Sequence, residues 1–256
     1  MNNQIPKFIQ KTCKEKNAIP LYYAESGSRL WGFHSADSDF DIRGIHLVSQ
    51  KDYFRIDKPK EVIEVLDGDL DLVSFSLDKA FTLLANSNPS LLEWFRGNII
   101  YQNNLKGYEK LKKDVLNEIN LKALFWHYVS MGKQNYVKYV EKEEQFTYKK
   151  VLYVLRVLLS AEFIYQKKAI PPLDFEELVD KLEFEKKVDS LLRQILRKKK
   201  EKAEKDTVEN KEDVLKVVKG FFEKVSTEDV PVTGNKKNLW EILNTYSVKI
   251  KEENYL

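Results

Sequence analysis

The alternation of apolar and polar residues changes character near residue 100. Residues 5–17 have helical spacing, and strand-like patterns follow at 21–25 and at about 39–48, 61–66 and 70–76. Helical spacing returns at 77–85 and continues through almost all of the chain from about residue 104, with a break at 170–173. We therefore predict a small α/β domain over residues 1–100 and a helical domain over residues 101–256.

Two local signals define turns and caps within the first domain. Asp67-Gly68 separates two strand-like runs, which is a strong signal for a β-hairpin. Asn88-Pro89 combines a good N-cap residue with proline in the first turn, so a helix is predicted from there through Phe95.

Composition narrows the class of protein. The chain has 256 residues, of which 43% are hydrophobic and 32% charged, and this balance is typical of a globular protein. No apolar run approaches the ~18 residues of a membrane span, and the N-terminus lacks a signal-peptide pattern. The single cysteine, Cys13, excludes an intramolecular disulfide and a cysteine-rich zinc site. We expect a cytoplasmic protein without a membrane partner.

The candidate chemistry lies in the first domain, where a Gly-Ser turn precedes two closely spaced carboxylates. Asp39 and Asp41 follow Ser28 by 11 and 13 positions, and strand alternation would place both aspartates on one face. Adjacent carboxylates repel, so a cation between them is the simplest way to keep both ionised. Mg²⁺ suits this arrangement, and Gly27-Ser28 could supply N–H groups and a hydroxyl to phosphates. The pattern indicates a site for a metal-bound nucleoside triphosphate.

Other interpretations of the aspartates are less consistent with the sequence. A calcium loop starting at Asp37 would need glycine and glutamate where the chain has Ile42 and Val48. Asp71 is a further acid on a strand, where a neutral or β-branched residue is expected. It could be a solvated strand carboxylate, or it could complete the metal site.

These residues resemble the active-site pattern of the DNA polymerase β-type nucleotidyltransferase superfamily. Within it, the chain is similar to the YcgL/RlaP-like predicted nucleotidyltransferases over about residues 18–180. The matching segments are Gly27–Gly32, Ser38–Gly44, Asn88–Trp94, Lys149–Arg156 and Pro171-Pro172. The resemblance implies an α+β fold, with a nucleotidyltransferase-type mixed β-sheet and flanking helices followed by an all-helical domain.

The resemblance also implies a mechanism. Asp39, Asp41 and Asp71 would be the catalytic, metal-binding residues for two Mg²⁺ ions, with Mn²⁺ as an alternative. Nucleoside monophosphate would pass from a triphosphate such as ATP to an acceptor hydroxyl, with release of pyrophosphate. Gly27, Ser28 and Arg29 would contact the nucleotide.

Residues 147–166 form a predicted helix with a polar ridge of Lys149, Tyr153, Arg156 and Ser160. Lysine and arginine on one ridge could hold a triphosphate, and Lys150 could replace Lys149. The alternative is an ordinary solvated helix face. The family likeness favours nucleotide binding by Lys149 or Lys150, Tyr153 and Arg156.

The acceptor is less defined by the sequence. Net charge is only +3, but Arg193–Lys202 is markedly basic, and basic ridges can contact a phosphodiester backbone. Residues 198–213 mix both signs and lack large apolar residues, which favours a solvated helix or a flexible linker over a binding patch. The resemblance favours an RNA acceptor, either a tRNA end or RNA under repair, because the family is associated with RNA ligation. The alternatives are transfer to a protein or small molecule, as in toxin- and antibiotic-modifying enzymes, and an inactive nucleotide- or RNA-binding module.

Overall fold

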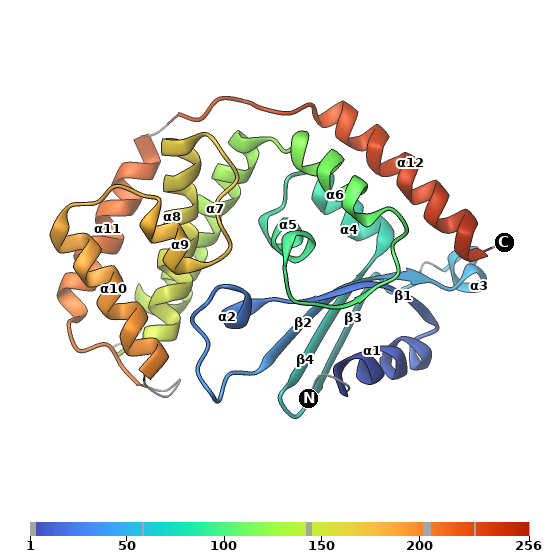
Figure 1. The fold of residues 1–256 in the computed structure, drawn as a ribbon, viewed down its shortest axis with the longest axis horizontal. Helices are drawn as coiled ribbons and strands as arrows, with labels where there is room; N and C mark the ends of the chain where they lie inside the picture. Colours follow the sequence, from blue (N-terminus) through green and yellow to red (C-terminus); the bar gives the residue numbers. More distant parts are fainter. Residues whose placement is uncertain (1–3, 58, 142–144, 202–205, 228, 256) are drawn as a thin grey trace. The chain divides into compact units, whose positions relative to one another are not determined.

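The structure is a computed structural model that describes residues 4–57, 59–141, 145–201, 206–227 and 229–255. The chain divides into two compact units, coloured along the sequence in Figure 1. The first unit comprises Met1–Leu30, Asp39–Asn120 and Gly234–Leu256, and the second comprises Trp31–Ser38 and Leu121–Thr233.

The first unit contains a five-stranded mixed sheet in the order β3-β4-β2-β1-β5. The pairing of β2 with β4 is parallel, and the other pairings are antiparallel. The predicted hairpin is confirmed, because β3 and β4 pair up to Asp67 and Leu70 with Gly68 in the left-handed region at φ 58°. The strands are β1 (Ala18–Glu25), β2 (Phe40–Val48), β3 (Val62–Asp67), β4 (Leu70–Ser76) and β5 (Ile100–Asn103).

Helices cover both faces of this sheet. α1 packs on one face, while α4 and α5 pack on the other and α12 contacts α4 and α6. The predicted cap is confirmed: the Asn88 side chain accepts a hydrogen bond from the Leu91 N–H at the start of α5. The helices of this unit are α1 (Gln4–Glu15), α2 (Gly27–Leu30), α3 (Gln50–Tyr53), α4 (Leu77–Ala85), α5 (Pro89–Arg96), α6 (Tyr108–Asn117) and α12 (Lys236–Tyr255).

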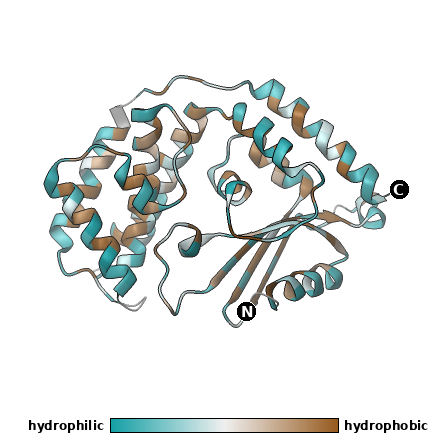
Figure 2. Ribbon diagram, viewed as in Figure 1, coloured by the Kyte–Doolittle hydropathy of each residue, from teal (hydrophilic) through white to brown (hydrophobic). Residues whose placement is uncertain are grey.

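The core beneath α1 is apolar but contains a buried polar chain. Ile5 and Ile9 of α1 pack on the sheet, whose strands carry apolar residues in Figure 2. Among them, the Tyr23 hydroxyl lies 3.0 Å from the Cys13 thiol and 2.9 Å from the Ser74 hydroxyl. The same Ser74 hydroxyl lies 2.9 Å from Nδ1 of His46. These polar groups therefore satisfy one another, as buried polar groups require.

In its described residues, the second unit contains helices and an isolated bridge between Thr147 and Thr207. α8 is its central helix, buried along nearly all of its length and in contact with α7, α9, α10 and α11. Its helices are α7 (Leu121–Tyr136), the π-helical segment η1 (Val137–Glu141), α8 (Tyr148–Lys167), α9 (Phe175–Asp180), α10 (Lys186–Glu201) and α11 (Lys211–Thr227).

The α+β class with a mixed sheet is confirmed, but the observed units differ from the predicted division at residue 100. β5 and α6 extend the first unit to Asn120, and α12 joins it from the far end of the chain. β5 is a short, exposed edge strand and so has little apolar periodicity. The unit to which α12 belongs cannot be determined from the local spacing of its residues. No helix in the described ranges is long and apolar enough to cross a membrane.

We expect His46 to make folding sensitive to mild acid. Burial lowers the pKa of His46 to about 4, below its ordinary value of 6.5. The unfolded chain then binds more protons between these values, so stability is full above pH 6.5 and is lost as pH falls toward 4. The free energy of unfolding measured in urea should therefore be about 2 kcal/mol smaller at pH 5 than at pH 7 because of His46.

His46→Gln should reduce that difference between the two pH values, whereas His34→Gln, at an exposed position, should leave it in place. An equal pH dependence in the wild type and in His46→Gln would contradict this assignment.

Candidate functional site

Two of the three predicted carboxylates are brought together by strand pairing. Asp41 near the start of β2 lies directly opposite Asp71 near the start of β4 in the parallel register. Leu72 and Ile42, their neighbours in sequence, are fully buried on the α1 face, so both aspartates lie on the other face. Side chains opposite each other across two strands are close neighbours, so the pair forms one cluster of negative charge.

Arg43 joins these two carboxylates. Its Nη2 donates to Asp41 Oδ1 at 2.8 Å and to Asp71 Oδ2 at 2.7 Å. Its Nη1 donates to the backbone carbonyls of Asp71 at 2.7 Å and Ile42 at 3.2 Å. The exposed fraction is 15% for the Arg43 side chain, 23% for Asp41 and 37% for Asp71. The guanidinium is therefore a partly buried cation held between two acids.

The Gly-Ser turn lies against the same cluster. The Ser26 N–H donates to the Asp41 carbonyl at 2.8 Å, which fixes the chain at the point where it leaves β1. Gly27 has φ +60°, and a Cβ at this position would lie only 1.8 Å from Asp41 Oδ2. Ser28 follows in α2 and is 3% exposed. A glycine is required at position 27 both by its backbone conformation and by the close approach of Asp41.

Glu25 is a part of the site that the sequence analysis did not identify. It is fully buried at the end of β1, and its Oε1 accepts a hydrogen bond from the Asp41 N–H at 2.8 Å. The Tyr101 hydroxyl donates to its other oxygen. Burial raises the pKa of Glu25, while the hydrogen bonds from Tyr101 and Asp41 oppose that rise. The available signal was an acid ending a strand that is otherwise apolar.

Asp39 and Arg29 lie at the edge of this arrangement. Asp39 is exposed and stands one residue before β2, which begins at Phe40 and not at Asp39 as predicted. The Arg29 Nε donates to the Asp39 carbonyl at 3.2 Å, and its guanidinium lies 4.0 Å from the centre of the Phe40 ring. Arg29 therefore supports the segment that leads into Asp41.

The donor chemistry of the cluster suits a hard divalent cation. Carboxylate oxygens are the preferred protein ligands of Mg²⁺, which takes one or two of them and completes its shell with water and phosphate. Across the residues described, no group of three or more histidine, cysteine, aspartate or glutamate side chains is arranged to hold a metal ion. Arg43 lies where a cation shared by Asp41 and Asp71 would lie.

The predicted polar ridge belongs to the second unit, where it packs inward. The Arg156 guanidinium lies 3.8 Å from the centre of the Trp31 ring, and only 6% of the residue is exposed. Tyr153 meets the same ring edge-on at 5.5 Å. Lys149 and Lys150, near the start of α8, are half-buried. The ridge is thus not an ordinary solvated helix face.

A buried lysine holds the segment that links the Gly-Ser turn to Asp39. Residues 31–38 of this segment belong to the second unit. Lys199 of α10 is 1% exposed, and its Nζ donates to the Ser35 hydroxyl at 2.7 Å. The Ser35 N–H donates to the Ser38 hydroxyl at 3.0 Å. Lys199 therefore has an internal role that its position in a basic run did not suggest.

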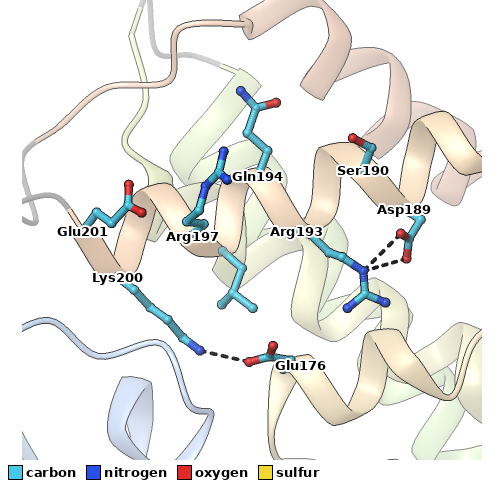
Figure 3. A pocket seen from close by; sticks show the side chains of 9 residues that line it. Glu176, Asp189, Ser190, Arg193, Gln194, Arg197, Lys200 and Glu201 are labelled. Carbon is cyan, nitrogen blue, oxygen red and sulfur yellow. Dashed lines mark hydrogen bonds and ion pairs between the residues drawn. The ribbon is translucent and has the colours of Figure 1, made fainter.

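Much of the remaining basic run on α10 is neutralised by acids. This helix borders a hollow of about 750 Å³. Figure 3 shows Arg193 in contact with Asp189 and Lys200 in contact with Glu176 there. Arg193 also pairs with Asp180 at 2.8 Å. Positive charge in this hollow is therefore weaker than the sequence alone suggests.

The paired strand carboxylates are Asp41 and Asp71, whereas the sequence predicted Asp39 and Asp41 on one strand face with Asp71 as a third metal ligand. Residues 1–249 match the family described as RlaP, RNA repair pathway DNA polymerase beta family. The chain belongs to this family, and membership supports a nucleotidyltransferase.

The chain is also similar to two uncharacterized proteins. The chain is 31% identical over 245 residues to the uncharacterized protein YcgL of Bacillus subtilis (strain 168), covering 95% of this chain and 94% of that protein. It is 32% identical over 143 residues to the uncharacterized protein MJ0002 of Methanocaldococcus jannaschii, covering 54% and 57% of the two chains.

A comparison with solved structures matched a nucleotidyltransferase-like protein from Exiguobacterium sibiricum 255-15. The match covers 99% of this chain and 80% of the other, with 11% identity. The TM-score is 0.33, which is too low to establish a shared fold.

We expect Gly27→Ala to destabilise the protein more than Gly68→Ala. Both glycines have a left-handed backbone, at φ +60° and +58°, so both substitutions cost about 1 kcal/mol from backbone strain. Only the Gly27 substitution would also push a methyl group into the Asp41 carboxylate, since nothing lies within 4 Å of a Cβ at Gly68. The free energy of unfolding in urea should therefore fall further for Gly27→Ala, and equal losses would argue against the close approach.

Proposed function

We propose that this protein transfers a nucleoside monophosphate from a nucleoside triphosphate to a hydroxyl of RNA. The observation that carries the proposal is the in-register pairing of Asp41 with Asp71 beside the left-handed turn at Gly27. The family match over residues 1–249 gives independent support for nucleotidyl transfer.

Each part of the cluster has a chemical task in this reaction. Asp39, Asp41 and Asp71 would hold Mg²⁺, which when bound neutralises the triphosphate and the charge that develops during displacement. The turn at Gly27-Ser28 would bind phosphate oxygens through N–H groups and the serine hydroxyl.

The reaction itself requires mainly positioning. The acceptor hydroxyl oxygen forms a bond to the α-phosphorus, the bond from that phosphorus to pyrophosphate breaks, and the hydroxyl proton is released. Glu25 accepts a hydrogen bond from the Asp41 N–H and so keeps the Asp41 carboxylate in place against Gly27. The roles of Lys149, Lys150, Tyr153 and Arg156 in nucleotide binding remain predictions from the sequence.

RNA is the favoured acceptor because the family description refers to an RNA repair pathway. The exposed side chain of Arg197 and the partly paired cations of α10 could contact a phosphodiester backbone. The partial neutralisation of this helix argues for modest, salt-sensitive RNA binding and not for a strong general affinity.

Asp41→Asn and Asp71→Asn should each abolish most transfer while the fold survives. Losing one metal-holding carboxylate should lower the rate about 100-fold or more, because electrostatic stabilisation of the transition state is lost. Asp69→Asn is the matched control, since Asp69 is an exposed acid in the β3–β4 turn two residues from Asp71. Transfer is followed with an α-labelled triphosphate, and circular dichroism monitors folding. Wild-type rates in either site variant would exclude this assignment of the site.

Incubation with each α-labelled triphosphate, Mg²⁺ and cellular RNA should label RNA of defined length. RNA binding should also weaken as salt rises, because each phosphate contact releases counterions. Binding is measured by fluorescence anisotropy between about 50 and 200 mM salt, a range over which several phosphate contacts produce a large change. Label found on a protein or a small metabolite, with none on RNA, would instead select the alternative acceptors.

A further inference from the structure

Arg43 occupies the position between two carboxylates that the proposed function assigns to a metal ion. One nitrogen, Nη2, contacts both Asp41 and Asp71 at 2.8 and 2.7 Å. The two contacted oxygens are therefore at most about 5.5 Å apart, which is the sum of these distances. A divalent cation shared by the same two oxygens would need nearly the same space, and it would be repelled by a guanidinium left there.

The guanidinium is well held in this position. Besides both carboxylates, it donates to the backbone carbonyls of Ile42 and Asp71. Hydrogen bonds between charged groups are stronger than neutral ones, and partial burial reduces screening by solvent. Without a cation at this position, the two aspartates of neighbouring strands would repel each other.

We propose that Arg43 is an internal counter-cation that a divalent metal ion must displace from the Asp41–Asp71 pair. This inference rests on the proposed function for the identity of the site, but it concerns binding and not turnover. It assigns Arg43 a role in setting metal affinity, whereas a purely structural role would only tie β2 to β4.

Competition of this kind has a defined effect on affinity. When the binding-competent arrangement is only a small fraction of the molecules, the apparent dissociation constant rises by the inverse of that fraction. If Arg43 leaves the pair in about one molecule in ten, removing its guanidinium should tighten metal binding about tenfold.

The test is a titration of the full-length protein with Mn²⁺, followed by electron paramagnetic resonance, without nucleotide or RNA. Arg43→Gln should bind Mn²⁺ about tenfold more tightly than the wild type. Arg29→Gln is the matched control, because it also removes one positive charge near the site but leaves the Arg43 bridge intact. A much smaller gain is expected for Arg29→Gln.

Two results would overturn the proposal. One is unchanged Mn²⁺ affinity in a folded Arg43→Gln protein, and the other is an equal gain in Arg29→Gln, which would reflect net charge alone. If Arg43→Gln does not fold, the guanidinium resonance of Arg43 is followed by nitrogen-15 NMR in the wild type, assigned with Arg43→Lys. It should shift as Mg²⁺ is added, and an unmoved resonance would equally refute displacement.

Failure of this proposal can be separated from failure of the proposed function. The titrations contain no triphosphate or acceptor, so they can succeed in a protein that transfers nothing. Conversely, loss of transfer in Asp41→Asn and Asp71→Asn would support the proposed function even if Arg43 does not compete with the metal.

Discussion

The parallel pairing of β2 with β4 is the constraint on which the site depends. Its register places Asp41 opposite Asp71, although 30 positions separate them along the chain. Backbone hydrogen bonds fix this register, so two like charges are held together by the sheet in spite of their repulsion. Arg43 offsets the repulsion from a position two residues after Asp41, where strand alternation returns its side chain to the same face.

The two faces of the sheet carry side chains of different chemistry. Facing α1, the buried chain of Cys13, Tyr23, Ser74 and His46 satisfies its own polar groups within an apolar core. The opposite face carries the charged cluster near the starts of β2 and β4. Glu25, at the end of β1, is the buried connection to this cluster through the Asp41 N–H. Burial of its carboxylate is costly unless hydrogen bonds compensate, which Asp41 and Tyr101 supply.

The sequence predicted the parts of this structure that local chemistry determines. The hairpin at Gly68 and the cap at Asn88 arise from residues within a few positions of each other, and both are present. Partners distant in sequence were not predictable in the same way. Nothing near Glu25 indicates Tyr101, and nothing near Lys199 indicates Ser35, because these contacts exist only after the chain has folded. The ion pairs of the basic run on α10 were not predictable for the same reason, since the acids that contact it include Glu176 and Asp180 on another helix.

The register of β4 limits where residues can be added to this chain. Residues 49–57 and 59–61, between β2 and β3, lie outside the sheet, so residues added among them would leave the alternation of β4 unaltered. Adding one residue between Asp71 and Leu72 while keeping Leu72–Ser76 in register would turn Asp71 toward the α1 face. The chain can therefore take up added residues between β2 and β3, but a single insertion inside β4 beside Asp71 would separate the two carboxylates.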